Sequence, residues 1–159
     1  MHIWLLTHSE ELKKPNGTGQ IVKAQLPQAC TVVVWKRTEP DKQLASLPLD
    51  KTLLIYPTAE PEHFDALSEP LTVSQAEHVI LLDGTWQQAR KIYNRTEYLK
   101  RFQHYSIPNQ QSSFQRRRNQ LDGGLCTAET AAYLLHEKGL TKQAESLNTA
   151  FLAFNNLQS

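Results

Sequence analysis

Short apolar runs separated by polar segments make up the first two thirds of the chain. Five runs have the length and the branched or aromatic content of β-strands, at residues 2–6, 31–35, 52–57, 78–83 and 104–108. The first four are apolar throughout and do not alternate with polar residues, so both faces of their sheet are expected to be covered. The pattern predicts an α/β fold, in which helices cover both faces of a mainly parallel sheet.

Helical periodicity begins directly after the fourth run. Starting from Trp86, apolar residues fall at i, i+3, i+6 and i+7, which is one face of a helix. Residues 126–138 are rich in helix formers and stop before Gly139, a common helix terminator. A last helix is predicted from the apolar face within residues 144–154, and shorter helical segments at 20–26 and 96–102. The polar segments 7–19, 36–50 and 109–124 are predicted to be connections.

Length and cysteine content favour one cytoplasmic domain. The chain has 159 residues, enough for a single domain with a substantial core. No apolar run approaches the roughly 18 residues that a membrane span needs, and the first residues do not resemble a signal peptide. Cys30 and Cys126 are far apart in the sequence, which is typical of a reduced compartment and of neither a disulfide framework nor a zinc knuckle.

The net charge of +1 conceals a strongly basic segment. Residues 90–118 contain eight of the 17 Lys and Arg and a single acid, Glu97, which gives the segment a net charge of +7. The other residues carry nine basic and 15 acidic side chains, a net charge of −6. Such a distribution favours a localised site for a polyanion, although a solvated charged face has the same composition.

Asp83 ends the fourth apolar run and is followed by Gly84 and Thr85. Ligands of parallel α/β sheets bind beyond the carboxyl ends of the strands, beside helix N-termini. Gly84 permits a close backbone approach, and Thr85 is a good helix cap. Asp83 is therefore a candidate site residue, and the alternative is that Asp83 and Thr85 only start the helix.

Other candidates carry weaker signals. The loop at residues 15–19 could present backbone N–H groups to an anion, but it lacks a P-loop lysine and resembles an ordinary turn. Three consecutive arginines follow Phe114, a combination that suits RNA or a solvated loop. The six histidines have no metal-ligand spacing, so no metal site is expected. Cys126 is expected to contribute to packing.

The stretch LDGTWQQARKI at residues 82–92 resembles the signature of the DTW-domain family, L-D-G-T-W-x-x-A-x-K-[MIL]. Three further family blocks occur in the same order. The first block, H-x-x-E…T-G, is matched by His8, Glu11, Thr18 and Gly19. The second, L-[LIF]-[YF]-P followed by an acid, is matched by Leu54, Ile55, Tyr56, Pro57 and Glu60. The third, S-x-[YF]-x-x-R…L-[SC]-T-x-E, is matched by Ser112, Phe114, Arg117, Leu125, Cys126, Thr127 and Glu129.

The resemblance implies a tRNA-uridine aminocarboxypropyltransferase. Such enzymes transfer the 3-amino-3-carboxypropyl group of S-adenosylmethionine (SAM) to uridine N3 and release 5′-methylthioadenosine. It also implies a fold similar to the SPOUT class, with a C-terminal trefoil knot that holds SAM. The expected organisation is a single domain over residues 1–159, without the cysteine-rich N-terminal segment of many members. Whether the protein is a monomer or a homodimer stays open.

The resemblance also implies roles for individual residues. Asp83 is the expected catalytic residue, either as the base that removes the N3 proton or as a group that orients the uracil and stabilises the sulfonium. The SAM site is expected to comprise Thr18, Gly19, Pro57, Leu81, Asp83, Gly84, Trp86, Leu125 and Thr127. The target uridine is expected to flip into the pocket. Phosphates of the tRNA are expected to contact Arg90, Lys91, Arg95, Arg116, Arg117 and Arg118.

Two alternatives remain at this stage. A SPOUT-type RNA methyltransferase would use the same cofactor and RNA but transfer a different carbon. A non-enzymatic RNA-binding module would have lost the cofactor, which the intact Asp83–Gly84–Thr85–Trp86 signature argues against.

Overall fold

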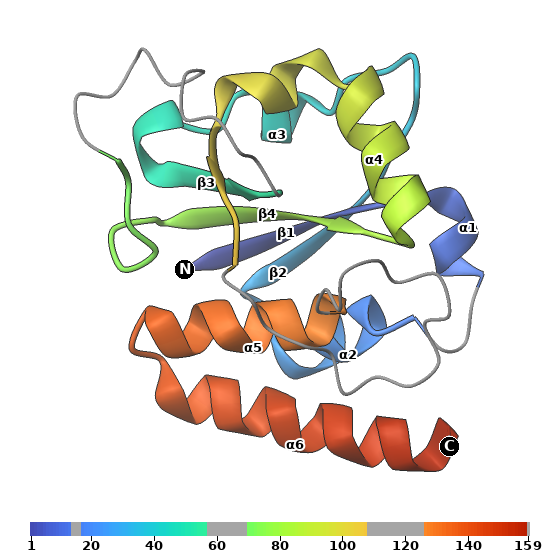
Figure 1. Cartoon of the computed structure of the whole chain (residues 1–159), viewed down its shortest axis with the longest axis vertical. Helices are drawn as coiled ribbons and strands as arrows, with labels where there is room; N and C mark the ends of the chain where they lie inside the picture. Colours follow the sequence, from blue (N-terminus) through green and yellow to red (C-terminus); the bar gives the residue numbers. More distant parts are fainter. Residues whose placement is uncertain (14–16, 57–69, 108–125, 159) are drawn as a thin grey trace.

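A computed structural model describes residues 1–13, 17–56, 70–107 and 126–158 of the protein. Its centre is a sheet of five strands, all parallel, in the order β2-β1-β4-β3-β5 (Figure 1). The strands are β1 (His2–Thr7), β2 (Cys30–Val34), β3 (Thr52–Ile55), β4 (His78–Asp83) and β5 (Gln103–Tyr105). The α/β class and the parallel sheet predicted from the apolar runs are thereby confirmed.

Helices cover both faces of this sheet, which gives the molecule three layers (Figure 1). One face packs against α2 (Gly19–Gln25) and α5 (Thr127–Glu137), with α6 (Thr141–Gln158) behind them. The other face packs against α3 (Lys42–Ala45), α4 (Trp86–Arg95) and the 3₁₀ helix η3 (Glu97–Arg101). The short helix α1 (Ser9–Leu12) follows the carboxyl end of β1, and the 3₁₀ helix η1 (Leu49–Lys51) leads into β3.

The apolar strands supply one core on each face of the sheet. Successive side chains of a strand point to opposite faces. In β1 and β4, the odd-numbered residues, such as Leu5 and Leu81, belong to the core under α2 and α5. The even-numbered residues, such as Leu6 and Ile80, belong to the core under α3 and α4. Because Leu5, Leu6, Ile80 and Leu81 are all buried, continuous apolarity was the correct signal for a sheet covered on both sides.

Two expectations about local structure were wrong. The last strand covers Gln103–Tyr105 rather than residues 104–108, because the buried amide of Gln103 pairs with the backbone of Leu71 through bonds of 2.7 and 2.9 Å. The polar connections at residues 7–19 and 36–50 contain α1, α3 and η1. A side-chain cap stabilises α3, in which the Asp41 carboxylate accepts from the backbone N–H of Leu44 at 2.9 Å.

The strand order places a switch point between β1 and β4. The chain leaves β1 through α2 toward β2, on one side of the sheet, and leaves β4 through α4 toward β5, on the other side. In open parallel sheets, ligands bind in the crevice at such a point, outside the carboxyl ends of the strands. Thr7 and Asp83 are partners in the register of β1 and β4, and they are the last residues of the two strands.

Candidate active site

Asp83 lies at the switch point and is only 5% exposed. The hydroxyl of Thr127, the first residue of α5, donates to Asp83 Oδ1 at 2.7 Å. The hydroxyl of Thr7, at the end of β1, lies 3.4 Å from Asp83 Oδ2 and 3.2 Å from the Leu5 carbonyl, and its one hydrogen can be donated to either oxygen. Hydrogen bonds to a charged carboxylate are stronger than those between neutral groups, so this arrangement stabilises the buried Asp83 side chain. It also joins β1, β4 and α5 at one point.

Thr18 and Gly19 complete this cluster from the start of α2. A Cβ atom on Gly19 would lie 2.3 Å from Asp83 Oδ2, so only glycine allows this approach. Thr18 is 4% exposed, and its hydroxyl accepts from the backbone N–H of Ala128 at 3.2 Å. We call Thr7, Thr18, Gly19, Asp83 and Thr127 the Asp83 cluster. Four of the residues predicted for the site are therefore in one place, although they come from three separate segments.

The helix that follows Asp83 is capped by other residues. Thr85 Oγ1 accepts from the backbone N–H of Gln88 at 3.2 Å, and Gln88 Oε1 accepts from the backbone N–H of Thr85 at 2.8 Å. This reciprocal pair is a capping box. Gly84 is required beside it, because a Cβ atom there would lie 2.7 Å from Gln88 Oε1. Thr85 is the cap that the sequence predicted, whereas the Asp83 carboxylate bonds Thr127 and Thr7 on the opposite face.

A stack of three aromatic rings begins at Trp86. The Tyr56 ring is stacked on Trp86 with centroids 5.8 Å apart, and on Tyr93 with centroids 4.1 Å apart. The hydroxyl of Tyr93 lies 2.6 Å from Nε2 of the buried His104. The other ring nitrogen of His104, Nδ1, donates to the carbonyl of Phe102 at 2.8 Å, so Nε2 accepts from Tyr93. Trp86 therefore belongs to a rigid wall built from β3, α4 and β5.

Burial also acts on the phenols of this stack. Desolvation, followed by the charge of Tyr93, raises the pKa of Tyr56, while Arg90 lowers it. Desolvation also raises the pKa of Tyr93. Both phenols remain protonated at neutral pH, so neither is a ready general base.

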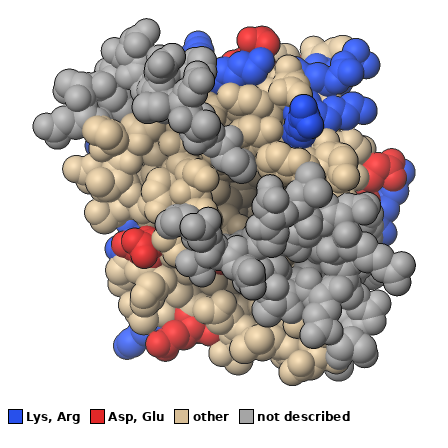
Figure 2. All heavy atoms as spheres, viewed as in Figure 1, with Lys and Arg blue, Asp and Glu red and all other residues tan. Residues whose placement is uncertain are grey.

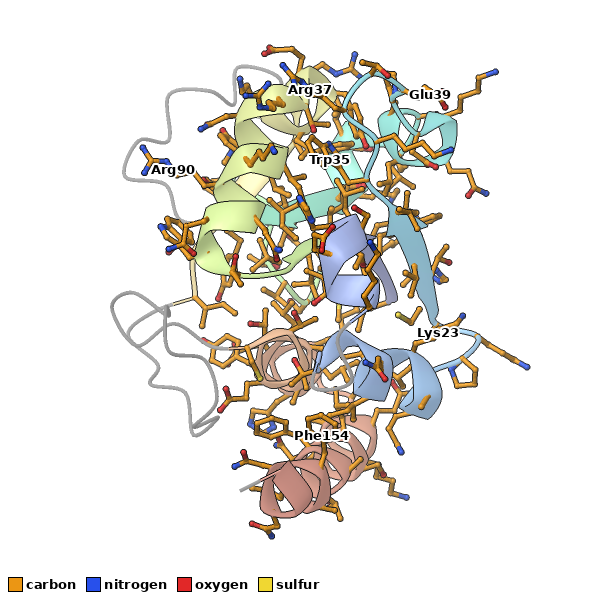
Figure 3. The ribbon with its side chains drawn as sticks, turned by 90° about the vertical axis from the view of Figure 1, so that its right-hand side faces the viewer. Lys23, Trp35, Arg37, Glu39, Arg90 and Phe154 are labelled. Carbon is orange, nitrogen blue, oxygen red and sulfur yellow. The ribbon has the colours of Figure 1, made fainter. Side chains whose placement is uncertain are left out.

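The remaining predicted residues divide into three groups. Leu81 is 3% exposed and packs in the core below Asp83. Arg90, Lys91 and Arg95 are exposed on α4, opposite its buried Ala89 and Ile92. Figure 2 shows Lys and Arg side chains gathered over this part of the molecule, and Figure 3 shows Arg90 on the outer side of α4. The third group lies outside the described residues and comprises Pro57, Leu125, Arg116, Arg117 and Arg118.

Both cysteines are buried. Desolvation raises the pKa of Cys126 to about 12 and that of Cys30 to about 11. A thiol with a raised pKa is a poor nucleophile because the thiolate is scarce. We expect both cysteines to resist alkylation in the folded protein at pH 8 and to react fully in denaturant. Mass spectrometry after iodoacetamide treatment measures this, and rapid alkylation of native Cys126 would contradict the assignment to packing.

Across the described ranges, no three His, Cys, Asp or Glu side chains are grouped so that they could hold a metal ion. None of the helices within those ranges is long and apolar enough to cross a membrane.

Comparison with known families gives a match over the same elements. The sequence model of the DTW domain matches residues 1–159. The chain belongs to the DTW-domain family. The Asp83 cluster and the wall at Trp86 are therefore the structural setting of the family signature in this DTW domain.

Curated relatives carry the name tRNA-uridine aminocarboxypropyltransferase 2. The protein of that name from Mus musculus is 32% identical over 105 residues, which cover 62% of this chain and 34% of the relative. The one from Drosophila melanogaster is 33% identical over 142 residues, which cover 84% of this chain and 54% of the relative. The chain thus spans about a third to a half of the length of these relatives. No solved structure matches.

Valine has nearly the shape of threonine but no hydroxyl, so a Thr127→Val variant tests the hydrogen bond of Thr127 alone. We expect Thr127→Val to lower the free energy of unfolding of the DTW domain by about 1–3 kcal/mol, because a buried carboxylate oxygen loses its shortest hydrogen bond. Thr130→Val is the matched control, since Thr130 is only partly buried on the same helix. Urea denaturation measures both variants, and equal stabilities would contradict the assigned bond.

Sequence reasoning missed several residues of this DTW domain. Thr7 was left within a loop, although a threonine that ends an apolar strand is a signal for a polar contact at the sheet edge. Tyr56 was quoted as part of a motif without a role. Tyr93 and His104 were assigned to a helix face and a strand, and their contact spans 11 residues that no local pattern connects.

Proposed function

We propose that this DTW-domain protein modifies tRNA, transferring the 3-amino-3-carboxypropyl group of SAM to N3 of a uridine and releasing 5′-methylthioadenosine. The names of the curated relatives support tRNA as the substrate and this group as the one transferred. The observation that supports the proposal is the Asp83 cluster, which lies with the family signature at the switch point between β1 and β4, where open parallel sheets usually bind ligands. We further propose that the protein acts in the cytoplasm.

The chemistry of the cluster fits SAM. Its sulfonium and amino groups are cationic, and Asp83 supplies a nearly buried carboxylate at the carboxyl edge of the sheet. The stacked rings of Trp86 and Tyr56 supply an apolar wall at the start of α4, the helix that follows Asp83 in the chain. We propose that Thr18, Gly19, Gly84 and Thr127 shape the same site, together with Pro57, Leu81 and Leu125. The proposed relation to the SPOUT class, including a trefoil knot, rests on the family resemblance.

SAM supplies a sulfonium that activates each of the three carbons bonded to sulfur. The protein selects one of them by position, because a displacement requires the nucleophile and carbon to be aligned. The Asp83 cluster is suited to this task, since it draws β1, β4, α2 and α5 together and leaves its polar groups little freedom.

The environment of Asp83 favours one of its two proposed roles. A general base must lie within hydrogen-bonding reach of the proton that it removes. Asp83 is 5% exposed, its Oδ1 accepts a hydrogen bond from the Thr127 hydroxyl, and its Oδ2 lies 3.4 Å from the Thr7 hydroxyl. We therefore propose that Asp83 stabilises the cationic sulfonium and fixes the surrounding loops, and that the N3 proton passes to solvent water rather than to Asp83.

The exposed basic residues of α4 are proposed to bind tRNA phosphates. We expect the double variant Arg90→Gln/Arg95→Gln to weaken tRNA binding and to reduce the slope of log K against log salt by about 2, because two phosphate contacts are lost. Fluorescence titration at several salt concentrations measures this. Lys142→Gln, an exposed change on α6, is the control, and an unchanged salt slope in the double variant would remove α4 from the RNA site.

The direct test uses bulk tRNA and SAM labelled separately in its methyl and carboxyl carbons. Carboxyl label in the tRNA, with the methyl label recovered in 5′-methylthioadenosine, is the expected result. Methyl label in the tRNA would show a methyltransferase instead. No label in the tRNA, despite SAM binding, would overturn the proposed reaction for the RNA supplied.

A further inference from the structure

A second pair of aromatic rings lies at the carboxyl edge of the sheet, outside the site described above. His8 follows the last residue of β1, and Trp35 follows the last residue of β2. Their rings are stacked, with centroids 5.8 Å apart and an angle of 29° between the planes. Both residues are partly exposed. We call them the His8–Trp35 pair.

Hydrogen bonds hold both rings in place. The indole N–H of Trp35 donates to the Thr96 hydroxyl at 2.8 Å, at the end of α4, and the Trp35 backbone N–H donates to the Thr7 carbonyl at 2.8 Å. His8 Nδ1 accepts from the backbone N–H of Glu10 at 3.2 Å. A ring pair fixed in this way loses little conformational entropy when another flat ring stacks on it.

The pair is adjacent to Asp83 but faces the other side of the sheet. The His8 backbone N–H donates to the Asp83 carbonyl at 3.2 Å. The Asp83 side chain points toward α2 and α5, whereas Trp35 packs against the core under α3 and α4. A chain of nucleotides that passes the Asp83 cluster along this edge would therefore meet the pair.

Cationic side chains flank the pair. Lys36 and Arg37 directly follow Trp35, and Arg95 on α4 precedes Thr96, the residue that holds the indole; all three are exposed. Figure 3 looks onto this edge and shows Trp35 between α4 and β2, below Arg37. Two acids near the pair in the sequence are matched by lysines: the Glu39 carboxylate lies 3.8 Å from Lys36 Nζ, and that of Glu10 lies 3.6 Å from Lys13 Nζ.

We propose that the His8–Trp35 pair is a stacking site for an unpaired nucleobase of the RNA, separate from the base that is modified. Aromatic rings beside cations are the usual means of binding single-stranded nucleic acid, because every nucleotide has a base that can stack on a ring and a phosphate that can pair with a cation. An imidazole stacked on an indole extends the flat surface toward solvent. This inference rests on the proposed function for its RNA partner, but not on the transferred group.

Two measurements test the site, both without SAM. In the first, tRNA carrying 4-thiouridine is cross-linked to the unaltered protein by light, and the linked peptides are identified by mass spectrometry. We expect links to the peptide that contains His8 or to the peptide that contains Trp35. Links found only elsewhere would overturn the proposal.

The second measurement compares tRNA affinities of variants at His8. We expect His8→Ala to bind tRNA about tenfold more weakly, as for the loss of one base stack. His8→Phe keeps an aromatic ring, so this variant should keep the tRNA affinity of the unaltered protein. If His8 only packed through its polar imidazole, there would be no reason for His8→Phe to keep that affinity. His136→Ala, an exposed change on α5, is the matched control. Unchanged affinity in His8→Ala would overturn the proposal, even if group transfer to tRNA is confirmed; weakened affinity would support it, even if no transfer occurs.

Discussion

Replacing Asp83 with Asn is expected to reduce group transfer to tRNA by about 100- to 1000-fold, the range seen when one preorganised electrostatic contact is removed from an active site. The amide is close in shape to the carboxylate, so the contacts of Asp83 with Thr127 and Thr7 can be partly rebuilt. What is lost is the negative charge at the switch point. Transfer of carboxyl-labelled SAM into tRNA measures the change.

A titration of SAM against the Asp83→Asn variant separates the two proposed roles of the carboxylate. If Asp83 stabilises the sulfonium and fixes the loops, SAM affinity falls together with turnover. If Asp83 is the base, SAM affinity is retained and turnover alone falls. Asp50→Asn, an exposed change in η1, is the matched control. Turnover equal to that of the unaltered protein would remove Asp83 from the reaction altogether.

Replacing Gly19 with Ala is expected to have the second largest effect. The new Cβ would lie 2.3 Å from Asp83 Oδ2 and 3.0 Å from its Cγ, so either the carboxylate or the start of α2 must move. Overpacking of this kind costs about 1–3 kcal/mol of stability. The better helix propensity of alanine returns at most about 1 kcal/mol. We therefore expect a net loss of stability and a marked loss of SAM affinity.

Urea denaturation and SAM titration together test the Gly19→Ala variant. Gln25→Ala, an exposed change at the other end of α2, is the control for helix propensity. Gly19 contacts Asp83 directly and is distant from the aromatic wall in the sequence. The Gly19→Ala substitution should therefore change SAM affinity in the same way as Asp83→Asn. A Gly19→Ala protein that is more stable than the parent and binds SAM normally would contradict the proposed close approach.

The sheet could be predicted because its signal is local. The strands β1 to β4 consist mainly of consecutive apolar residues, and those of β1 and β4 are apolar on both faces, as Leu5, Leu6, Ile80 and Leu81 illustrate. The signal for the start of α4 is equally local, since the capping residues Thr85 and Gln88 lie three residues apart. The shifted position of β5 has a long-range cause, because the bonds that bury Gln103 involve Leu71, 32 residues away.

The site could be predicted only in part, because its contacts join distant segments. Asp83 meets Thr127 across 44 residues and Thr7 across 76. No periodicity in the sequence indicates those pairs, and only the family resemblance pointed to Thr18, Gly19 and Thr127 together. No sequence pattern predicted the His8–Trp35 pair. The two residues are brought together by the pairing of β1 with β2, which places the ends of these strands side by side.

We propose that this DTW domain transfers an aminocarboxypropyl group to uridine N3. The most direct measurement is mass spectrometry of the nucleosides from an unmodified tRNA transcript after incubation with the protein and SAM. We expect a uridine that carries this group on N3, formed by the unaltered protein and nearly absent with Asp83→Asn. A methylated nucleoside in its place, or equal product from both proteins, would contradict it.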